Sequence, residues 1–229
     1  MTRSAISSDE WLRQHQWTAM KMLAEHELLG ETYWNEGRSA AWIIGKPGTN
    51  IHRIEIIAGI MGSLVVHGDF ELSRFAHYGD RADAWSRLLW MAYSMDVGYY
   101  VAQKATIGMR REEVEAYEPV VAEYDLEYWI ADAKLAGNVG LASVLREALD
   151  HVAEEHELRE FLYDNDRGYD LWELRLGKVL RPHVIISHVA LNKCASLLWE
   201  KYGAEGPRQC RPRPPGGPES PQKGCSLTP

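Results

Sequence analysis

Residues 42–69 read WIIGKPGTNIHRIEIIAGIMGSLVVHGD, and this is the stretch that most clearly predicts β-structure. Its content of β-branched residues favours strands over helices. The predicted strands are 40–44, 51–57 and 63–66, and the predicted turns are 46–50 and 58–62. Short connections between successive strands predict an antiparallel meander, and residues 70–77 are a candidate for an added edge strand.

The sequence on either side of this stretch shows helical spacing of apolar residues. A Ser7-x-x-Glu10 capping box opens the first helix, and Pro182 opens the last. The predicted helices are 9–29, 81–94, 110–118, 119–136, 141–163, 171–176 and 182–202, with a loop at 31–39 and either a strand or a helix start at 98–102. These patterns predict an α+β fold, in which a small antiparallel β-meander packs against a mostly helical C-terminal half.

The composition of the chain changes sharply near residue 203. Seven of the ten prolines lie in 207–229, together with several arginines. Such a segment has too little apolar surface to fold by itself, so we expect residues 203–229 to form a disordered Pro/Arg-rich tail. Residues 1–202 are long enough for one α+β domain, and a sub-boundary near residue 108 stays open as an alternative.

The charge of the chain limits the classes of partner. Its formal net charge is −8, and residues 203–229 hold four basic against two acidic residues, so residues 1–202 carry −10. A segment this acidic lacks the basic face that phosphate contacts require, so we expect no direct binding of nucleic acid. It fits a soluble enzyme, a partner for basic protein surfaces, or a mimic of nucleic-acid charge.

Three cysteines without close spacing predict neither a disulfide framework nor a zinc site. Cys194 lies in an apolar helical pattern and is expected to be buried. The chain shows no hydrophobic leader and no apolar run of about 18 residues, so the sequence predicts a cytoplasmic protein without a membrane span. The tryptophans are expected mainly in the core, with an aromatic binding surface as the alternative.

The β-stretch ends in His67-Gly68-Asp69, and His77 and Asp80 follow shortly after it. If the meander folds back, these two histidines and two aspartates meet at one end of the sheet. Imidazole and carboxylate groups bind zinc, iron or manganese, and they also serve general acid–base catalysis. The alternative is that Gly68-Asp69 forms a turn and Asp80 caps a helix, because the spacing matches no known metal signature.

Other catalytic signatures are absent from the sequence. His151 and His156 are five residues apart, about 140° around a helix, whereas the histidines of metalloprotease helices are four apart and share one face. The sequence contains no P-loop, no dinucleotide-binding glycine fingerprint, no Gly-x-Ser-x-Gly elbow and no Cys-x-x-Cys. We therefore expect no cofactor.

A run of acidic residues extends from Glu112 to Asp132, with no lysine or arginine between Arg111 and Lys134. On helices these carboxylates would form a negative ridge. The ridge is either a solvated face or a docking surface for a protein with a basic surface, such as a nucleic-acid-binding cleft. The candidate partner-binding residues are Glu112, Glu113, Glu115, Glu118, Glu123, Asp125 and Glu127.

The order of motifs in residues 40–77 resembles a group of small phage and prophage proteins. The shared features are the Lys-Pro-Gly-Thr turn at 46–49, a strand, a second turn, and a Gly-Asp pair followed by Phe75. The chain departs from that group at the second turn, which lacks the usual aromatic residue, and in the histidine that precedes Gly-Asp. The resemblance implies a phage-borne context and assigns no catalytic residue.

Two functions follow as expectations. The first is a phage-borne accessory protein that binds a host or phage protein in the bacterial cytoplasm, for example to inhibit a nucleic-acid-handling defence complex through the acidic surface. The alternative is a metal-dependent or acid–base enzyme that uses His67, Asp69, His77 and Asp80, so enzymatic activity stays open. A structural or DNA-packaging role is a third option, and the sequence indicates no oligomeric state.

Overall fold

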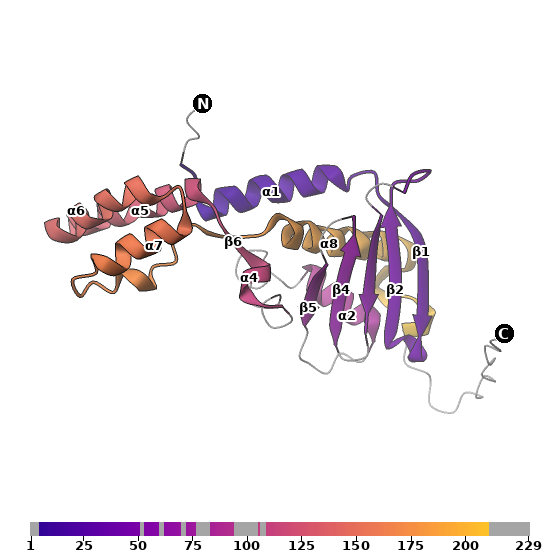
Figure 1. Cartoon of the computed structure of the whole chain (residues 1–229). Helices are drawn as coiled ribbons and strands as arrows, with labels where there is room; N and C mark the ends of the chain where they lie inside the picture. The colour runs from indigo at the N-terminus through magenta and orange to yellow at the C-terminus, as the bar shows by residue number, and fades with distance from the viewer. Residues whose placement is uncertain are drawn as a thin grey trace, which may run out of the picture.

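A five-stranded antiparallel sheet forms the centre of the larger part of the molecule (Figure 1). The computed structural model describes residues 5–50, 53–59, 62–69, 72–76, 83–93, 105 and 109–210. The strands follow one another in chain order: β1 (Glu27–Trp34), β2 (Ser39–Gly45), β3 (Ile54–Ala58), β4 (Ser63–Gly68) and β5 (Ser73–Ala76). The predicted α+β fold and its antiparallel meander are confirmed.

The sheet buries one of its two faces. Along β3 and β4 buried side chains alternate with partly exposed ones, as the period of a strand requires. Trp42, Ile56 and Val66 are neighbours in the register and are fully buried, so they form one apolar row across three strands. This row fixes the register, because a shift of one residue would turn all three side chains towards solvent.

The first strand differs from the sequence prediction. We expected a helix at 9–29 and a loop at 31–39, but α1 (Ser8–Met22) ends earlier and β1 pairs along β2. The β1 register is irregular between Leu28 and Gly30, which marks a bulge. A bulged edge strand lacks the strict alternation that identifies a strand in a sequence, so the helix prediction is wrong beyond Met22.

The central helix of this part is α8 (Pro182–Tyr202), which packs against α1 and α2 (Ala84–Tyr93) and also contacts β1, β4 and β5. It begins at Pro182 and ends before Gly203, as predicted. Cys194 is fully buried on this helix, as expected, and His188 on the same helix is also buried. We call β1–β5, α1, α2 and α8 the body, because their buried side chains form one hydrophobic cluster.

A second hydrophobic cluster lies in a helical lobe that projects away from the sheet (Figure 1). The lobe consists of α5 (Pro119–Leu135), α6 (Val139–Ala148) and α7 (Glu155–Asp164). A short helix α4 (Arg111–Val114) and an antiparallel ribbon of β6 (Glu115–Tyr117) and β7 (Lys178–Leu180) connect the lobe to the body. The molecule therefore has two cores, while the assignment of residues 1–202 to one domain stays a prediction.

The helix predictions in and around the lobe are wrong in part. Residues 141–163 do not form one helix, because α6 ends at Ala148 and the chain turns through η2 (Leu149–His151) before α7. This turn lets Leu158 face the same core as Leu145, and no glycine or proline marks it in the sequence. Residues 110–118 continue from α4 into β6, and the expected helix at 171–176 is the short 3₁₀ turn η3 (Leu171–Glu173).

Residues 203–210, which we expected in the tail, pack on the body as the turns η4 (Gly203–Glu205) and η5 (Arg208–Cys210). A Cβ at Gly206 would collide with the ring of Trp85, so the backbone lies directly on that ring. The sulfur of Cys210 lies 3.6 Å from the carbonyl oxygen of Gly37. Residues 211–229 and 98–102 lie outside the described residues.

Among the residues that the structure describes, no helix has the length and apolar character needed to span a membrane.

Candidate functional site

His67 lies at the end of β4 and contacts the neighbouring strand. Its Nε2 is 3.0 Å from Oε2 of Glu55, its cross-strand partner on β3. A Cβ at Gly68 would collide with the carbonyl oxygen of Arg53, so the close approach of the two backbones requires glycine here. The glycine of the His-Gly-Asp group therefore has a structural explanation, and the histidine already has a carboxylate neighbour.

The predicted cluster of His67, Asp69, His77 and Asp80 is only partly described. His77 and Asp80 lie outside the described residues. Within the described ranges, no three or more histidine, cysteine, aspartate or glutamate side chains are grouped so that they could hold a metal ion. The cluster stays a prediction, and elemental analysis of the purified protein and of a His67→Ala variant would test it.

The predicted partner-binding carboxylates lie on α4, β6 and α5, and several of them serve the fold. Oε2 of Glu113 accepts the backbone N–H of Arg110 at 2.9 Å, which caps α4. Oδ2 of Asp125 accepts the backbone N–H of Gly177 at 2.9 Å. Burial raises the pKa of Asp125, and the hydrogen bond from Gly177 opposes this rise. Glu115 is held in ion pairs, so the acidic residues do not form one continuous free ridge.

Helix α5 has an exposed apolar face in addition to its buried one. Its buried side chains are Val121, Ala122, Leu126, Ile130 and Ala133. On the opposite side, Tyr124, Tyr128 and Leu135 follow helical spacing, with Tyr128 60% and Leu135 89% exposed. Glu127 and Asp132 are exposed on the two flanks of this row. We call Tyr124, Tyr128 and Leu135 the exposed stripe.

The exposed stripe was missed in the sequence, where the choice between core and binding surface was considered for the tryptophans and not for the tyrosines. The signal that could have found it is the apolar spacing on two sides of residues 119–135. A surface helix that packs on one side only carries a single apolar stripe, so a second stripe indicates a second contact.

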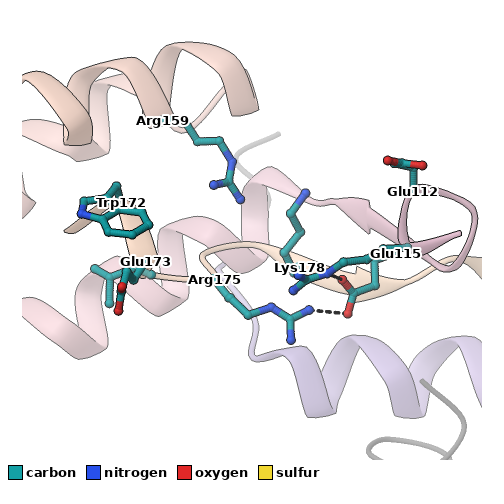
Figure 2. Close-up of a pocket in the computed structure, with 9 residues that line it drawn as sticks. Glu112, Glu115, Arg159, Trp172, Glu173, Arg175 and Lys178 are labelled. Carbon is teal, nitrogen blue, oxygen red and sulfur yellow. Dashed lines mark hydrogen bonds and ion pairs between the residues drawn. The ribbon is translucent and has the colours of Figure 1, made fainter. Parts of the chain in front are cut away.

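Four basic side chains surround a cavity of about 490 Å³ between α4, β6, α7 and η3 (Figure 2). They are Arg111, Arg159, Arg175 and Lys178, and with Trp172 they define what we call the basic pocket. Trp172 is 52% exposed and forms one side of the cavity (Figure 2). Three carboxylates, Glu112, Glu115 and Glu173, also line it.

The cations of the basic pocket are paired by two carboxylates. Nε of Arg111 is 3.1 Å from Glu115, which also binds Arg175. Nε of Arg159 and Nζ of Lys178 lie 2.8 and 2.6 Å from the same oxygen of the second carboxylate, Glu155. Two bridging carboxylates thus face four cations.

Both bridging carboxylates are ionised at neutral pH. Burial raises the pKa of Glu115, but hydrogen bonds from Arg175 and Arg111 lower it, and the pKa lies below its ordinary value. Burial likewise raises the pKa of Glu155, and Lys178 and Arg159 lower it below its ordinary value. The basic pocket is therefore a network of fixed charges in both signs.

Sequence reasoning did not find the basic pocket. Its four cations stand in separate segments of the chain, at positions 111, 159, 175 and 178, and they meet only because α7 folds back beside the β6–β7 ribbon. No local spacing of basic residues signals such a site.

Comparison with protein-family models, curated proteins and solved structures finds no match to this chain.

Proposed function

We propose that this chain acts by binding a protein that presents aliphatic side chains flanked by lysine or arginine, and that the exposed face of α5 is the contact surface. The observation that carries the proposal is the exposed stripe, which lies opposite the buried face of the same helix. Its tyrosines belong to the residue types that dominate the energy of protein interfaces.

The charges beside the exposed stripe support a basic partner. Glu127 and Asp132 flank the exposed stripe, and Glu123 lies one turn before Glu127 on the same helix. A basic segment laid along α5 would bury the tyrosines and place its cations beside these carboxylates. Apolar burial would supply most of the affinity, and the charges would set the association rate and the orientation of the partner.

The resemblance of residues 40–77 to phage and prophage proteins supports a more specific form of this proposal. In this form the chain is a phage-borne accessory protein, and its partner is a host complex that handles nucleic acid. Surfaces that bind nucleic acid are basic, so the acidic face of α5 would compete for the same cations.

The proposal is tested by a double variant, Tyr124→Ser with Tyr128→Ser, in quantitative affinity capture followed by direct binding to the purified partner. We expect at least about a tenfold loss of affinity, because two exposed aromatic side chains leave the interface. The control is Tyr163→Ser on α7, which removes a tyrosine that is 72% exposed elsewhere on the lobe. Charge reversal by Glu127→Lys with Asp132→Lys should also weaken binding, and Glu157→Lys on α7 is its control.

Two outcomes would overturn the proposal. One is that every captured protein binds the double variant as well as it binds the wild type. The other is that light scattering shows a dimer that the double variant dissociates, in which case a second copy of this chain occupies the stripe.

A further inference from the structure

The segment that follows α8 lies on the body as a short strap, which we define as residues 203–210. It begins at Gly203, and its last turn, η5, contacts the connection between β1 and β2 at η1 (Asn35–Gly37) (Figure 1). Gly203 has a φ of +64°, and no atom lies within 4 Å of its Cβ position. The chain therefore has open space at the point where the strap leaves the helix.

A Gly-Pro pair seats the strap on an aromatic surface. A Cβ at Gly206 would lie 2.2 Å from Cδ1 of Trp85, so only glycine lets the backbone lie on this ring. Pro207 is buried directly after it, and proline brings no N–H group that needs an acceptor. The ring of Trp85 stacks on Trp199 at a centroid distance of 6.3 Å, and Trp199 is 46% exposed. Surfaces lined by aromatic rings are those on which proteins bind extended segments that contain proline.

The contact between strap and body leaves two buried N–H groups unpaired. Trp85 and Arg87 are 4% and 2% exposed. Within the part of the chain that the structure describes, Nε1 of Trp85 and Nε of Arg87 have no hydrogen-bond partner. Arg87 donates through a terminal nitrogen to the carbonyl oxygen of Arg38. A buried donor without an acceptor costs free energy, so the strap is a less favourable cover for these two side chains than a fully bonded segment.

The last residue of the strap, Cys210, is half-buried beside the same two side chains. Burial raises the pKa of its thiol to about 11, and the backbone N–H of Trp85 and the charge of Arg87 oppose this rise. The thiolate is the reactive form of cysteine, so the thiol reacts slowly while the strap is in place. Release of the strap would expose the thiol and lower its pKa, and its rate of labelling therefore measures release.

We propose that the surface formed by Trp85 and Trp199 binds an extended Gly-Pro segment of a partner protein, and that the strap occupies this surface in the free chain. The ring of Trp85 requires glycine at the first position of the pair, as it does at Gly206. The strap competes at a high effective concentration because it belongs to the same chain. The surface lies on the body and the exposed stripe lies on the lobe, so the inference does not depend on the proposed function.

The first experiment measures release of the strap in the full chain. Cys225→Ser is the background, so that Cys194 and Cys210 are the remaining thiols. Gly206→Ala should speed labelling of Cys210 by dithionitrobenzoate at least about tenfold, because the added Cβ pushes the strap off the ring beneath it. Cys194 is fully buried and should stay unlabelled. The matched control is Gly203→Ala, which also replaces a strap glycine of positive φ but meets no atom, and it should label within about threefold of the background.

The second experiment measures binding of peptides to the surface by isothermal titration. The probes are the strap sequence with serine for its cysteine, GAEGPRQS, the same peptide with alanine for its second glycine, and SSGPSS, which has Gly-Pro in unrelated flanks. The Gly206→Ala chain should bind the strap peptide with a dissociation constant below about 1 mM and SSGPSS within about tenfold of it. The wild type should bind both at least about tenfold more weakly, because its own strap competes. The alanine peptide should not bind either chain.

Several results would overturn the proposal. Equal labelling of Cys210 in Gly206→Ala and in the background would mean that the strap is not released, and labelling of Cys194 would mean that strap and body unfold together. Absence of peptide binding to Gly206→Ala at about 5 mM, or equal binding of the alanine peptide, would mean that the surface does not recognise Gly-Pro. Binding of the strap peptide without binding of SSGPSS would restrict the surface to the chain's own segment.

Discussion

At the scale of single residues, His188 is the buried titratable group with the clearest consequence. Its Nε2 donates a hydrogen bond to the carbonyl oxygen of Met91 at 3.3 Å. Burial lowers the pKa of His188 to about 4, and the bond to Met91 opposes this shift only in part. An imidazole in the unfolded chain has a pKa of about 6.5, so protons favour the unfolded chain between these two values.

We predict that the stability of the body falls as the pH is lowered from about 6.5 towards 4, with a contribution from His188 of up to ~3 kcal/mol. Above about pH 6.5 this contribution is complete and constant. Urea unfolding of the wild type and of His188→Gln at several pH values measures it, and the variant should have a flatter pH dependence. The exposed His156→Gln serves as the control, and an unchanged slope in His188→Gln would refute the assignment.

At the scale of elements, Gly177, directly before β7, holds the start of this strand against α5. Its φ is +67°, and a Cβ there would lie 2.8 Å from Cβ of Ala122 and from Cε2 of Tyr117. Its N–H binds Asp125 and its carbonyl oxygen accepts the N–H of Glu118, at 2.9 Å in both cases. This glycine therefore joins the ribbon to the first helix of the lobe.

We predict that Gly177→Ala lowers the free energy of unfolding by ~2–4 kcal/mol, because it adds both backbone strain and overlap. Gly168→Ala is the matched control, since Gly168 also has a positive φ, of +85°, but has open space around its Cβ position. That variant should lose only ~1 kcal/mol. Thermal melts of the two variants compare them directly, and equal losses would show that overlap at Gly177 is unimportant.

The elements that the sequence predicts well are those that begin or end at a proline or a glycine. Pro182 and Gly203 bound α8, and the glycine turns bound β3 and β4. The break between α6 and α7 has no such mark, and β1 was predicted as the end of a helix followed by a loop, because its bulge disturbs the alternation. In these two places tertiary contacts decide the structure, and local propensity does not.

At the scale of the whole molecule, we expect the lobe and the body to unfold with different free energies, because each has its own core. Leu145 is buried in the lobe cluster, and Leu64 is buried in the body cluster. The two clusters meet at the start of α5, where Val121 belongs to the body cluster and Ala122 to the lobe cluster, next to the β6–β7 ribbon. Local unfolding of a lobe with its own small core needs less free energy than global unfolding.

We predict that Leu145→Ala lowers stability by ~2–5 kcal/mol and speeds amide hydrogen exchange in α5, α6 and α7, with little change in β1–β5. Leu64→Ala is the reciprocal control and should speed exchange in the sheet. Mass-spectrometric exchange reads both regions at once. A uniform rise over the whole chain in Leu145→Ala would mean that the two cores unfold together.

The candidate sites depend on this larger arrangement more than on any motif. Glu112 and Glu115 were selected from the sequence as members of an acidic ridge, and the structure places both beside a cavity lined by arginines. Their basic neighbours are up to 66 positions away, as for Arg181, which donates to the carbonyl oxygen of Glu115. The acidic residues of this region could be predicted because they are close together in the sequence, and the basic residues could not because they are far apart in it.

The β6–β7 ribbon also has a consequence for how such a chain can be rearranged. Tyr117 and Lys178 are paired neighbours on its two strands, so the chain leaves for the lobe and returns from it at one point. A tight hairpin joining these two residues would close the remaining polypeptide without spanning any gap. Residues 118–177 therefore leave and rejoin the rest of the fold at one point, and a replacement for them would also have to supply the contacts of Val121, which is buried in the body cluster.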